Sequence, residues 1–314
     1  MLWIGVGLIR SACGSGFLSG LGAPPDVVFC DTSPAMFPLL KFLFPKTKLL
    51  FYCHHPHQLM IPEYLLVFWL YKQYVKLFEA YCISFSDLVL ANSEYTAEQF
   101  SLVFPDFPGY KLKVLYPCIA EPTVPFEATR TRRKGLFFSL NRFWPEKQFE
   151  ILIQAVAHLR LMLPKHLWRH LIVVIAGSCD NQFEVTHQML SEKILFLRQP
   201  SDRVKLELMR SSQALIYTPD KEHFGMVPVE SMAVGTPVIA CGTGGPGKTV
   251  THQATGYVAK SNSPLEFAYA MREYLTIQNK ANTMAPNCRL RFIQKYTDEK
   301  LGEALIKLFN SMFD

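Results

Sequence analysis

Closely spaced cysteine pairs are absent from this sequence. Its eight cysteines stand far apart, with no Cys-x-x-Cys motif and no cluster of cysteine with histidine. That spacing argues against a zinc site and against a disulfide framework, and it fits a reducing compartment. Internal repeats and low-complexity tracts are also absent, so neither complicates the count of domains.

Charge is sparse, at 18% of the 314 residues, and the formal net charge is only +6. The densest basic cluster is Arg-Thr-Arg-Arg-Lys at 130–134, and it is not interleaved with aromatic residues that would stack on bases. The sequence therefore predicts no nucleic-acid partner. We interpret the cluster as a solvated linker between two halves of the chain, with contact to an anionic membrane surface as the alternative.

Long apolar runs free of charge or glycine are missing too. Residues 1–22 are apolar, but Arg10 interrupts them and six glycines dilute them, so we predict neither a signal peptide nor a transmembrane span. Residues 64–85 contain two lysines and a glutamate near helical spacing, which predicts an amphipathic helix. Such a helix either packs on the sheet of its own domain or rests one face on a bilayer.

The chain is rich in short hydrophobic runs that alternate with amphipathic segments. The runs have the composition of strands covered on both faces. They lie at 26–31, 48–54, 87–93 and 111–117 in the first half, and at 135–140, 171–177, 193–197, 214–219, 237–241 and 255–259 in the second. The segments 146–163 and 201–212 are typical of helices between such strands. This alternation predicts parallel sheets built from βαβ units.

We therefore predict an α/β fold with two doubly wound, Rossmann-like domains that face a cleft. A chain of 314 residues exceeds the size at which one core usually stops growing. Two prolines and the basic cluster mark the boundary between the halves. The expected division is an N-terminal domain at 1–125, a C-terminal domain at 134–296 and a C-terminal helix at 297–314.

Candidate ligand-binding residues follow the strands of the second half, because ligands of such sheets bind beyond the carboxyl ends of the strands. Arg142 and Lys147 follow one strand and bring two cations that suit a diphosphate. Gly177 ends the next strand and lets the backbone approach a ligand closely. A glycine-rich turn at 242–247 offers N–H groups to a phosphate or a sugar.

The loop after the strand at 214–219 carries two carboxylates. Gly225 permits a turn between them and Pro228 suits the first turn of a helix, so Glu230 is expected at or near a helix start and Glu222 in the loop. Carboxylates accept hydrogen bonds from the vicinal hydroxyls of a ribose or a hexose. Together with the cations and glycines they predict a nucleotide-sugar site. Each residue alone also fits a simpler role, as a helix-dipole acid, a surface charge or a turn glycine.

These motifs resemble those of retaining glycosyltransferases of family four, which have the GT-B fold. Residues 222–230, Glu-His-Phe-Gly-Met-Val-Pro-Val-Glu, are similar to the family's E-x7-E motif, and residues 141–147 are similar to its N-R-x4-K segment. Further family-like segments occur in order from about residue 26 almost to the C-terminus, among them Leu-Leu-Phe-Tyr-Cys-His-His-Pro-His and Pro-Val-Ile-Ala-Cys-Gly-Thr-Gly-Gly-Pro. Within the family they resemble the mannosyltransferases that build the dolichol-linked N-glycan precursor.

The resemblance implies a reaction and its partners. Mannose passes with retention from GDP-mannose to a dolichol-diphosphate-linked oligosaccharide through α-1,3 and/or α-1,6 linkages. No metal and no other cofactor is implied. The expected location is the endoplasmic reticulum membrane at its cytosolic face, with other mannosyltransferases of the pathway as further partners.

The resemblance also implies roles for single residues. Arg142 and Lys147 bind the diphosphate and stabilise the departing GDP, Glu230 binds the ribose, and Glu222 binds the transferred mannose. His54 reaches the site from the acceptor side. The remaining binding residues are one aromatic and several glycines: Gly177, Phe224, Gly225, Gly244 and Gly245.

Three departures from the family pattern leave alternatives open. Residues 1–25 do not match the strand and glycine-rich loop with which relatives begin, so we expect an incomplete N-terminal domain and a native protein longer than this chain. Lys248 stands where relatives usually carry a glutamate, and the stretch after Gly177 is shorter than in relatives, which bears on guanine selectivity. The alternative function is a truncated, non-catalytic homologue that acts as a scaffold or binds nucleotide sugars weakly. A further alternative is a family-four enzyme that uses UDP-N-acetylglucosamine.

Overall fold

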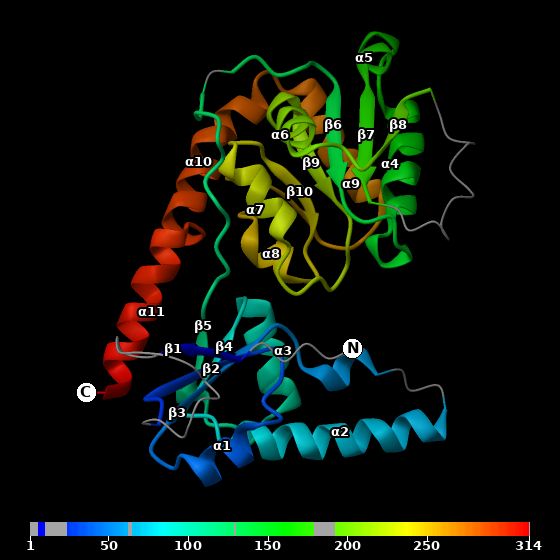
Figure 1. Ribbon diagram of the computed structural model, residues 1–314. Coiled ribbons are helices and arrows are strands. Elements are labelled where there is room, and N and C mark those ends of the chain that lie inside the picture. The colour runs from blue at the N-terminus through cyan, green and yellow to red at the C-terminus, as the bar shows by residue number, and fades with distance from the viewer. Residues whose placement is uncertain (1–5, 10–23, 62–64, 129, 179–191, 314) are drawn as a thin grey trace. The chain divides into compact units, whose positions relative to one another are not determined.

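The computed structural model describes residues 6–9, 24–61, 65–128, 130–178 and 192–313. The chain forms two compact units, residues 1–116 and 117–314 (Figure 1). Each unit contains one β-sheet with helices packed around it.

The sheet of the first unit has the strand order β1-β2-β3-β4-β5. Strands β2 to β5 are parallel, whereas β1 pairs antiparallel with β2. The strands are β1 Val6–Ile9, β2 Val27–Asp31, β3 Lys48–Cys53, β4 Leu88–Ala91 and β5 Leu112–Val114. The connections contain α1 Phe37–Leu43, η1 His57–Met60, α2 Leu66–Ser84, α3 Glu94–Val103 and η2 Gly109–Lys111. All four residues of β4 are buried, which is why its sequence is continuously hydrophobic.

The sheet of the second unit is entirely parallel, with the order β11-β10-β9-β6-β7-β8. Its strands are β6 Leu136–Leu140, β7 Ile172–Gly177, β8 Ile194–Arg198, β9 Ala214–Tyr217, β10 Val238–Cys241 and β11 Gly256–Ala259. The chain runs outward from β6 to β8 and then returns, so that β9 lies on the other side of β6. Ligands of doubly wound sheets bind at such a reversal of strand order, here between β6 and β9.

Helices cover both faces of this second sheet (Figure 1). The helices of the second unit are η3 Pro145–Lys147, α4 Phe149–Met162, α5 Lys165–His170, α6 Asp202–Ser211, α7 Met226–Ala233, α8 Gly245–Thr249, α9 Pro264–Thr276, α10 Lys280–Lys295 and α11 Asp298–Phe313, and α11 contacts α10. Helix α4 buries one face, including Leu152 and Leu159, and it packs against α9. The expected C-terminal helix is α11.

All ten predicted strands and the three predicted amphipathic helices are present. Strand β1 is an addition, because it lies within residues 1–25, where the sequence indicated no strand. The boundary between the units falls at Tyr116/Pro117, and the segment that follows belongs to the second unit. There the N–H of Ile119 donates to the carbonyl of Tyr296 at 2.9 Å, and Glu121 pairs with Arg289.

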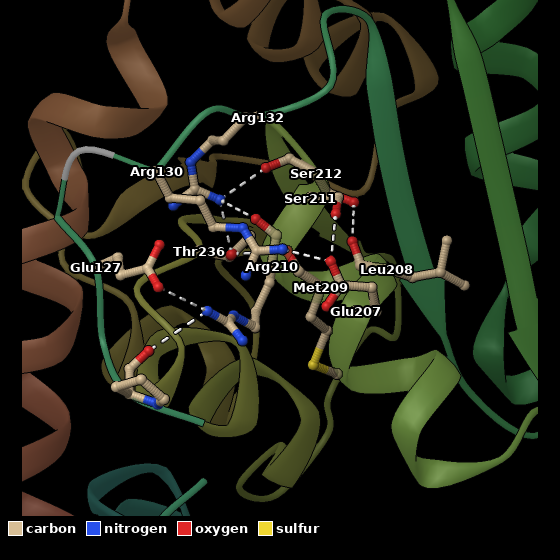
Figure 2. A network of polar contacts seen from close by, with 11 residues as sticks. Glu127, Arg130, Arg132, Glu207, Leu208, Met209, Arg210, Ser211, Ser212 and Thr236 are labelled. Atoms are coloured by element: carbon tan, nitrogen blue, oxygen red, sulfur yellow. Dashed lines mark hydrogen bonds and ion pairs between the residues drawn. The ribbon is translucent and has the colours of Figure 1, made fainter. Parts of the chain in front are cut away.

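The basic cluster at 130–134 is not the solvated linker that the sequence indicated, because Arg132 turns into the second unit. Its guanidinium donates to the carbonyl of Ser212 at 2.8 Å and to Thr236 Oγ1 at 2.9 Å (Figure 2). It also donates to the carbonyl of Gly235 at 2.8 Å. Burial lowers the pKa of Arg132 to about 10, and the group remains protonated at neutral pH. Net charge and spacing gave no sign of this, since the acceptors are mostly backbone carbonyls brought there by the fold.

Helix α2 confirms the helix expected at 64–85, and the C-terminal part of it packs on its own unit through Glu79, Cys82 and Ile83. Much of the rest of the helix is exposed, and many of its exposed residues are apolar. None of the helices that the structure describes combines the length and the apolar character needed to cross a bilayer.

Candidate active site

The loop after β6 presents the two predicted cations at the reversal of strand order. Its backbone is fixed to β7, since Asn141 N donates to Ala176 O at 3.0 Å and Phe143 N donates to Ser178 O at 2.9 Å. Gly177 is required for this arrangement, because an added Cβ would lie 1.6 Å from the Asn141 carbonyl oxygen. The glycine therefore admits the neighbouring loop, where the sequence predicted close approach of a ligand.

Lys147 and Glu222 meet at this edge from the two sides of the reversal. Lys147 Nζ lies 2.5 Å from Glu222 Oε2. The Lys147 carbonyl accepts a hydrogen bond from Thr218 Oγ1 at 2.7 Å, which ties the loop after β6 to the end of β9. The two side chains are 23% and 27% exposed, so the pair is reachable from solvent.

Tyr217 is a third member of this group, and the sequence gave no indication of it. It ends β9, its side chain is buried, and its hydroxyl donates to Glu222 Oε2 at 3.2 Å. Burial, followed by the charge of Glu222, raises the pKa of the Tyr217 phenol well above its usual value, so the group stays a hydrogen-bond donor. In the sequence this tyrosine is the last residue of a hydrophobic run, and such a run does not reveal that its hydroxyl has a polar partner.

The glycine turn after β10 packs against the backbone of the carboxylate loop. A Cβ at Gly244 would lie 2.7 Å from the Glu222 carbonyl oxygen, and one at Gly245 would lie 2.2 Å from that of His223. The N–H of Gly245 donates to Glu222 O at 2.6 Å. That N–H thus has an acceptor within the chain, where the sequence predicted a contact with ligand.

The turn into α7 explains the remaining residues of the motif. Gly225 has φ +85° and precedes the first residue of α7, a conformation that favours glycine. Pro228 lies in the first turn as predicted, whereas Glu230 lies in the second turn, one turn beyond the expected helix start. Phe224 is buried with its ring 5.8 Å from that of Tyr296, so its side chain packs in the core.

A cavity of about 920 Å³ adjoins the same edge of the sheet. Arg142, Gly177 and Glu230 line it. Burial raises the pKa of the Glu230 carboxyl, and the positive charge of Lys205 opposes that shift. Lys205 also lines the cavity, and it was missed because a lysine on an amphipathic helix has no distinguishing pattern in sequence.

The predicted residues therefore form two neighbouring groups in the second unit. One is the contact group of Lys147, Glu222, Gly244 and Gly245, and the other lines the cavity with Arg142, Gly177 and Glu230. Tyr217 belongs to the first group, because its hydroxyl donates to Glu222 Oε2. His54 belongs to the first unit, where it follows β3 and contacts Asp31. The stretch after Gly177, whose length bore on guanine selectivity, falls largely at 179–191, outside the described residues.

Comparison with known proteins decides the family. The model of the family "Glycosyl transferases group 1" matches residues 122–291, which include both groups of site residues. The human alpha-1,3/1,6-mannosyltransferase ALG2 is 30% identical over 301 residues, which cover 90% of this chain and 72% of the human protein. The chain is an ALG2-like group 1 glycosyl transferase. The mouse relative in this family is also 30% identical, over 92% of this chain and 74% of its own.

Solved structures agree on the fold of this family member. Anabaena HepE in complex with UDP superimposes with a TM-score of 0.73 at 20% identity, covering 91% of this chain and 79% of that one. Sucrose-phosphate synthase from Thermosynechococcus elongatus gives 0.69 at 18% identity, covering 92% and 74%. The two Rossmann-like sheets are those of the GT-B fold, as the sequence predicted.

Proposed function

We propose that this chain transfers mannose from GDP-mannose, with retention, to a dolichol-diphosphate-linked oligosaccharide. The linkages formed are α-1,3 and/or α-1,6, as the names of the ALG2 relatives imply. The observation that carries the proposal is the contact of Glu222 with Lys147 and Tyr217 at the reversal of strand order, in a chain of this family.

The proposed roles follow from the chemistry of each group. Arg142 and Lys147 are cations suited to the donor diphosphate, so the proposal needs no metal and no other cofactor. Glu230 lines the same cavity as Arg142 and accepts hydrogen bonds from the ribose hydroxyls. Glu222 accepts hydrogen bonds from the mannose. Phe224, Gly225 and the glycines of the turn support the site through the packing described above.

In the proposed reaction the donor phosphate leaves on the face at which the acceptor hydroxyl enters. The leaving phosphate oxygen takes the proton of that hydroxyl as the new glycosidic bond forms. Negative charge grows on the departing GDP, and the two cations stabilise it more strongly in the transition state than in the bound donor.

The test is transfer of labelled mannose from GDP-mannose to a short mannosylated dolichol acceptor. We predict that Glu222→Ala abolishes transfer while the circular dichroism spectrum and melting temperature stay close to wild type, because the change removes a hydroxyl acceptor and little core volume. Glu299→Gln is the matched control, since this acid lies exposed in the first turn of α11, and it should transfer normally.

The outcomes separate the candidate functions. An active wild type with full activity in Glu222→Ala would overturn the site assignment. An inactive wild type that binds GDP-mannose weakly would favour the non-catalytic homologue, which is the reading that Lys248 supports through its reversed charge. Transfer from UDP-N-acetylglucosamine instead of GDP-mannose would favour the third candidate.

The acceptor in this proposal is a membrane lipid, so the chain works at the cytosolic face of the endoplasmic reticulum membrane beside other enzymes of the pathway. Helix α2 supports a membrane contact, because its exposed residues are mainly apolar and aromatic while its lysines are cationic. The exposed apolar and aromatic residues of α2 are Leu66, Val67, Trp69, Leu70, Tyr71, Tyr74, Leu77, Phe78 and Tyr81.

We predict that Leu70→Glu together with Leu77→Glu lowers binding to vesicles of anionic phospholipid at least tenfold. Each change places a negative charge on the surface of α2 that is proposed to lie among the acyl chains. Leu161→Glu is the matched control, since this leucine is 86% exposed on α4. Sedimentation with vesicles measures the effect, and equal binding by the double variant and the control would contradict the membrane role of α2.

A further inference from the structure

Asp31 and His54 form a side-chain pair at the carboxyl edge of the first sheet, and the proposed function gives this pair no role. Asp31 ends β2 and His54 follows β3, and Oδ1 of the first lies 2.7 Å from Nε2 of the second. The side chains are 50% and 42% exposed, so the pair is accessible to a ligand. The edge is the one at which ligands of parallel sheets bind.

Contacts with Tyr52 of β3 and Thr96 of α3 also hold His54 in place. Its ring packs edge-on against Tyr52, with 4.9 Å between the centroids. Tyr52 is itself anchored, because its hydroxyl donates to the carbonyl of Leu115 at 3.1 Å. Thr96 Oγ1 of α3 lies 3.5 Å from the His54 carbonyl oxygen. The fold thus fixes both the backbone and the ring of this histidine.

Backbone strain lies directly beside the aspartate. Thr32 has φ 80°, which a β-branched residue rarely adopts. Asp31 nevertheless stays in register opposite Tyr52, and the chain turns sharply only after it. Strained residues of this kind cluster at functional sites, where the surrounding structure holds them. The strain supports a functional reason for placing Asp31 against the imidazole.

We propose that Asp31 is a positioning residue that, in the neutral form of the His54 imidazole, keeps the proton on Nε2 and so presents Nδ1 as an acceptor for a sugar hydroxyl. A carboxylate only accepts hydrogen bonds, so the ring nitrogen facing it is the donor. The other ring nitrogen then carries the lone pair. This inference rests on the proposed function, and the hydroxyl belongs either to the transferred sugar or to the acceptor sugar.

The first test needs no activity. Asp31→Asn replaces the acceptor by an amide whose NH₂ donates to Nε2, which moves the imidazole proton to Nδ1. Long-range ¹H–¹⁵N spectra of the full chain with labelled histidine locate the proton, and loss of one signal in His54→Gln identifies the residue. We expect the Nε2–H tautomer in wild type and the Nδ1–H tautomer in Asp31→Asn. An Nδ1–H tautomer in wild type would overturn the inference.

The second test measures transfer. We expect Asp31→Asn to lower kcat/KM about 10- to 100-fold, by analogy with the loss of the carboxylate that orients a metal-binding histidine. Asp26→Asn, an exposed acid at the opposite end of the same strand, is the control and should match wild type. In a His54→Gln background the Asp31 change should cost nothing further, because Asp31 acts through the histidine.

The affinities for GDP-mannose and GDP and the KM for the acceptor show which sugar supplies the hydroxyl. If the transferred sugar supplies it, Asp31→Asn weakens GDP-mannose relative to GDP; if the acceptor supplies it, that ratio is unchanged and KM for the acceptor rises. An active wild type with an unaffected Asp31→Asn, or with additive losses in the double variant, would overturn this inference alone. A wild type that transfers nothing would overturn the proposed function, while the tautomer spectrum still tests the pair.

Discussion

Glu222 is held in place by its neighbours before any ligand binds. Both Lys147 Nζ and the Tyr217 hydroxyl contact its Oε2 atom, at 2.5 and 3.2 Å. These contacts use one carboxylate oxygen, and the proposed function assigns the other, Oε1, to a sugar hydroxyl. A donor diphosphate would compete with Glu222 for the lysine, so donor binding exchanges one charge-assisted contact for another.

Tyr217 should matter for the orientation of Glu222 and little for the fold. We predict that Tyr217→Phe lowers kcat/KM for mannose transfer by about tenfold, since a hydrogen bond to a charged group contributes about 1.5–3 kcal/mol. The affinity for GDP should be unchanged, because the tyrosine contacts the carboxylate and not the cations. Steady-state kinetics and GDP titration measure the two quantities. Tyr269→Phe, at an exposed tyrosine of α9, is the control, and equal kinetics in the two variants would refute the role of Tyr217.

The candidate site was predictable from sequence wherever charge or glycine follows a strand. Arg142, Lys147, Glu222 and Glu230 were found in this way, because a parallel sheet gathers its carboxyl ends at one edge. Tyr217 was not, because a buried phenol within a hydrophobic strand resembles any core aromatic. The contact partners of the glycines were not predictable either, since they are backbone atoms of loops far away in sequence.

Helix α2 is fastened to the loop after β3 by a titratable pair. The carboxylate of Glu79, 5% exposed, lies 3.3 Å from Nδ1 of His57 and accepts a hydrogen bond from the N–H of the same residue at 3.2 Å. The hydrogen bond to Glu79 raises the pKa of His57 above its usual value, against the opposing effect of burial. The pair thus links one end of the apolar helix to the segment that carries His54.

The pH dependence of this link has a defined sign. A histidine whose pKa is higher in the folded chain stabilises the fold fully below its unfolded pKa and loses that contribution as pH rises through the folded pKa. We predict that Glu79→Gln lowers the free energy of unfolding more at about pH 6 than at about pH 9. The difference should stay below about 1 kcal/mol, because His57 is one-third exposed and solvent screens the charges. Urea unfolding at both pH values measures it.

A control for that experiment is His166→Gln, which changes an exposed histidine of α5. Its effect should be the same at both pH values. A loss for Glu79→Gln that is equal at the two pH values, or larger at the higher one, would contradict the ion-pair account.

At the scale of the chain, the order of the elements was predictable and the path between the units was not. Buried parallel strands have continuous hydrophobic runs, so each run could be read directly. Strand β1 has only four residues and lies in a glycine-rich segment, so no such run marks it. Residues 117–133 have prolines and charges typical of a linker. The backbone N–H of Ile119 and the guanidinium of Arg132 nevertheless donate mainly to backbone carbonyls of the second unit, and composition does not reveal such acceptors.

Arg132 makes several of the contacts between residues 117–133 and the rest of the second unit. Its guanidinium reaches two carbonyls at the C-terminal end of α6, Arg210 O and Ser212 O (Figure 2). It also donates to the carbonyl of Gly235 after α7 and to Asn282 of α10. We predict that Arg132→Ala lowers the free energy of unfolding by about 3 kcal/mol or more, because several buried acceptors lose their donor at once.

The neighbouring arginine isolates the effect from that of charge. Arg133 is exposed, and its hydrogen bonds with the described residues use its backbone N–H and carbonyl. Alanine keeps both groups, so Arg133→Ala should change the free energy of unfolding by no more than about 0.5 kcal/mol. Arg132→Lys should fall between the two, since it keeps the charge but cannot reach carbonyls on three sides as the planar guanidinium does. Equal urea midpoints for Arg132→Ala and Arg133→Ala would show that the contacts of the Arg132 guanidinium contribute nothing to stability, and the segment would then behave as the solvated linker that its composition indicates.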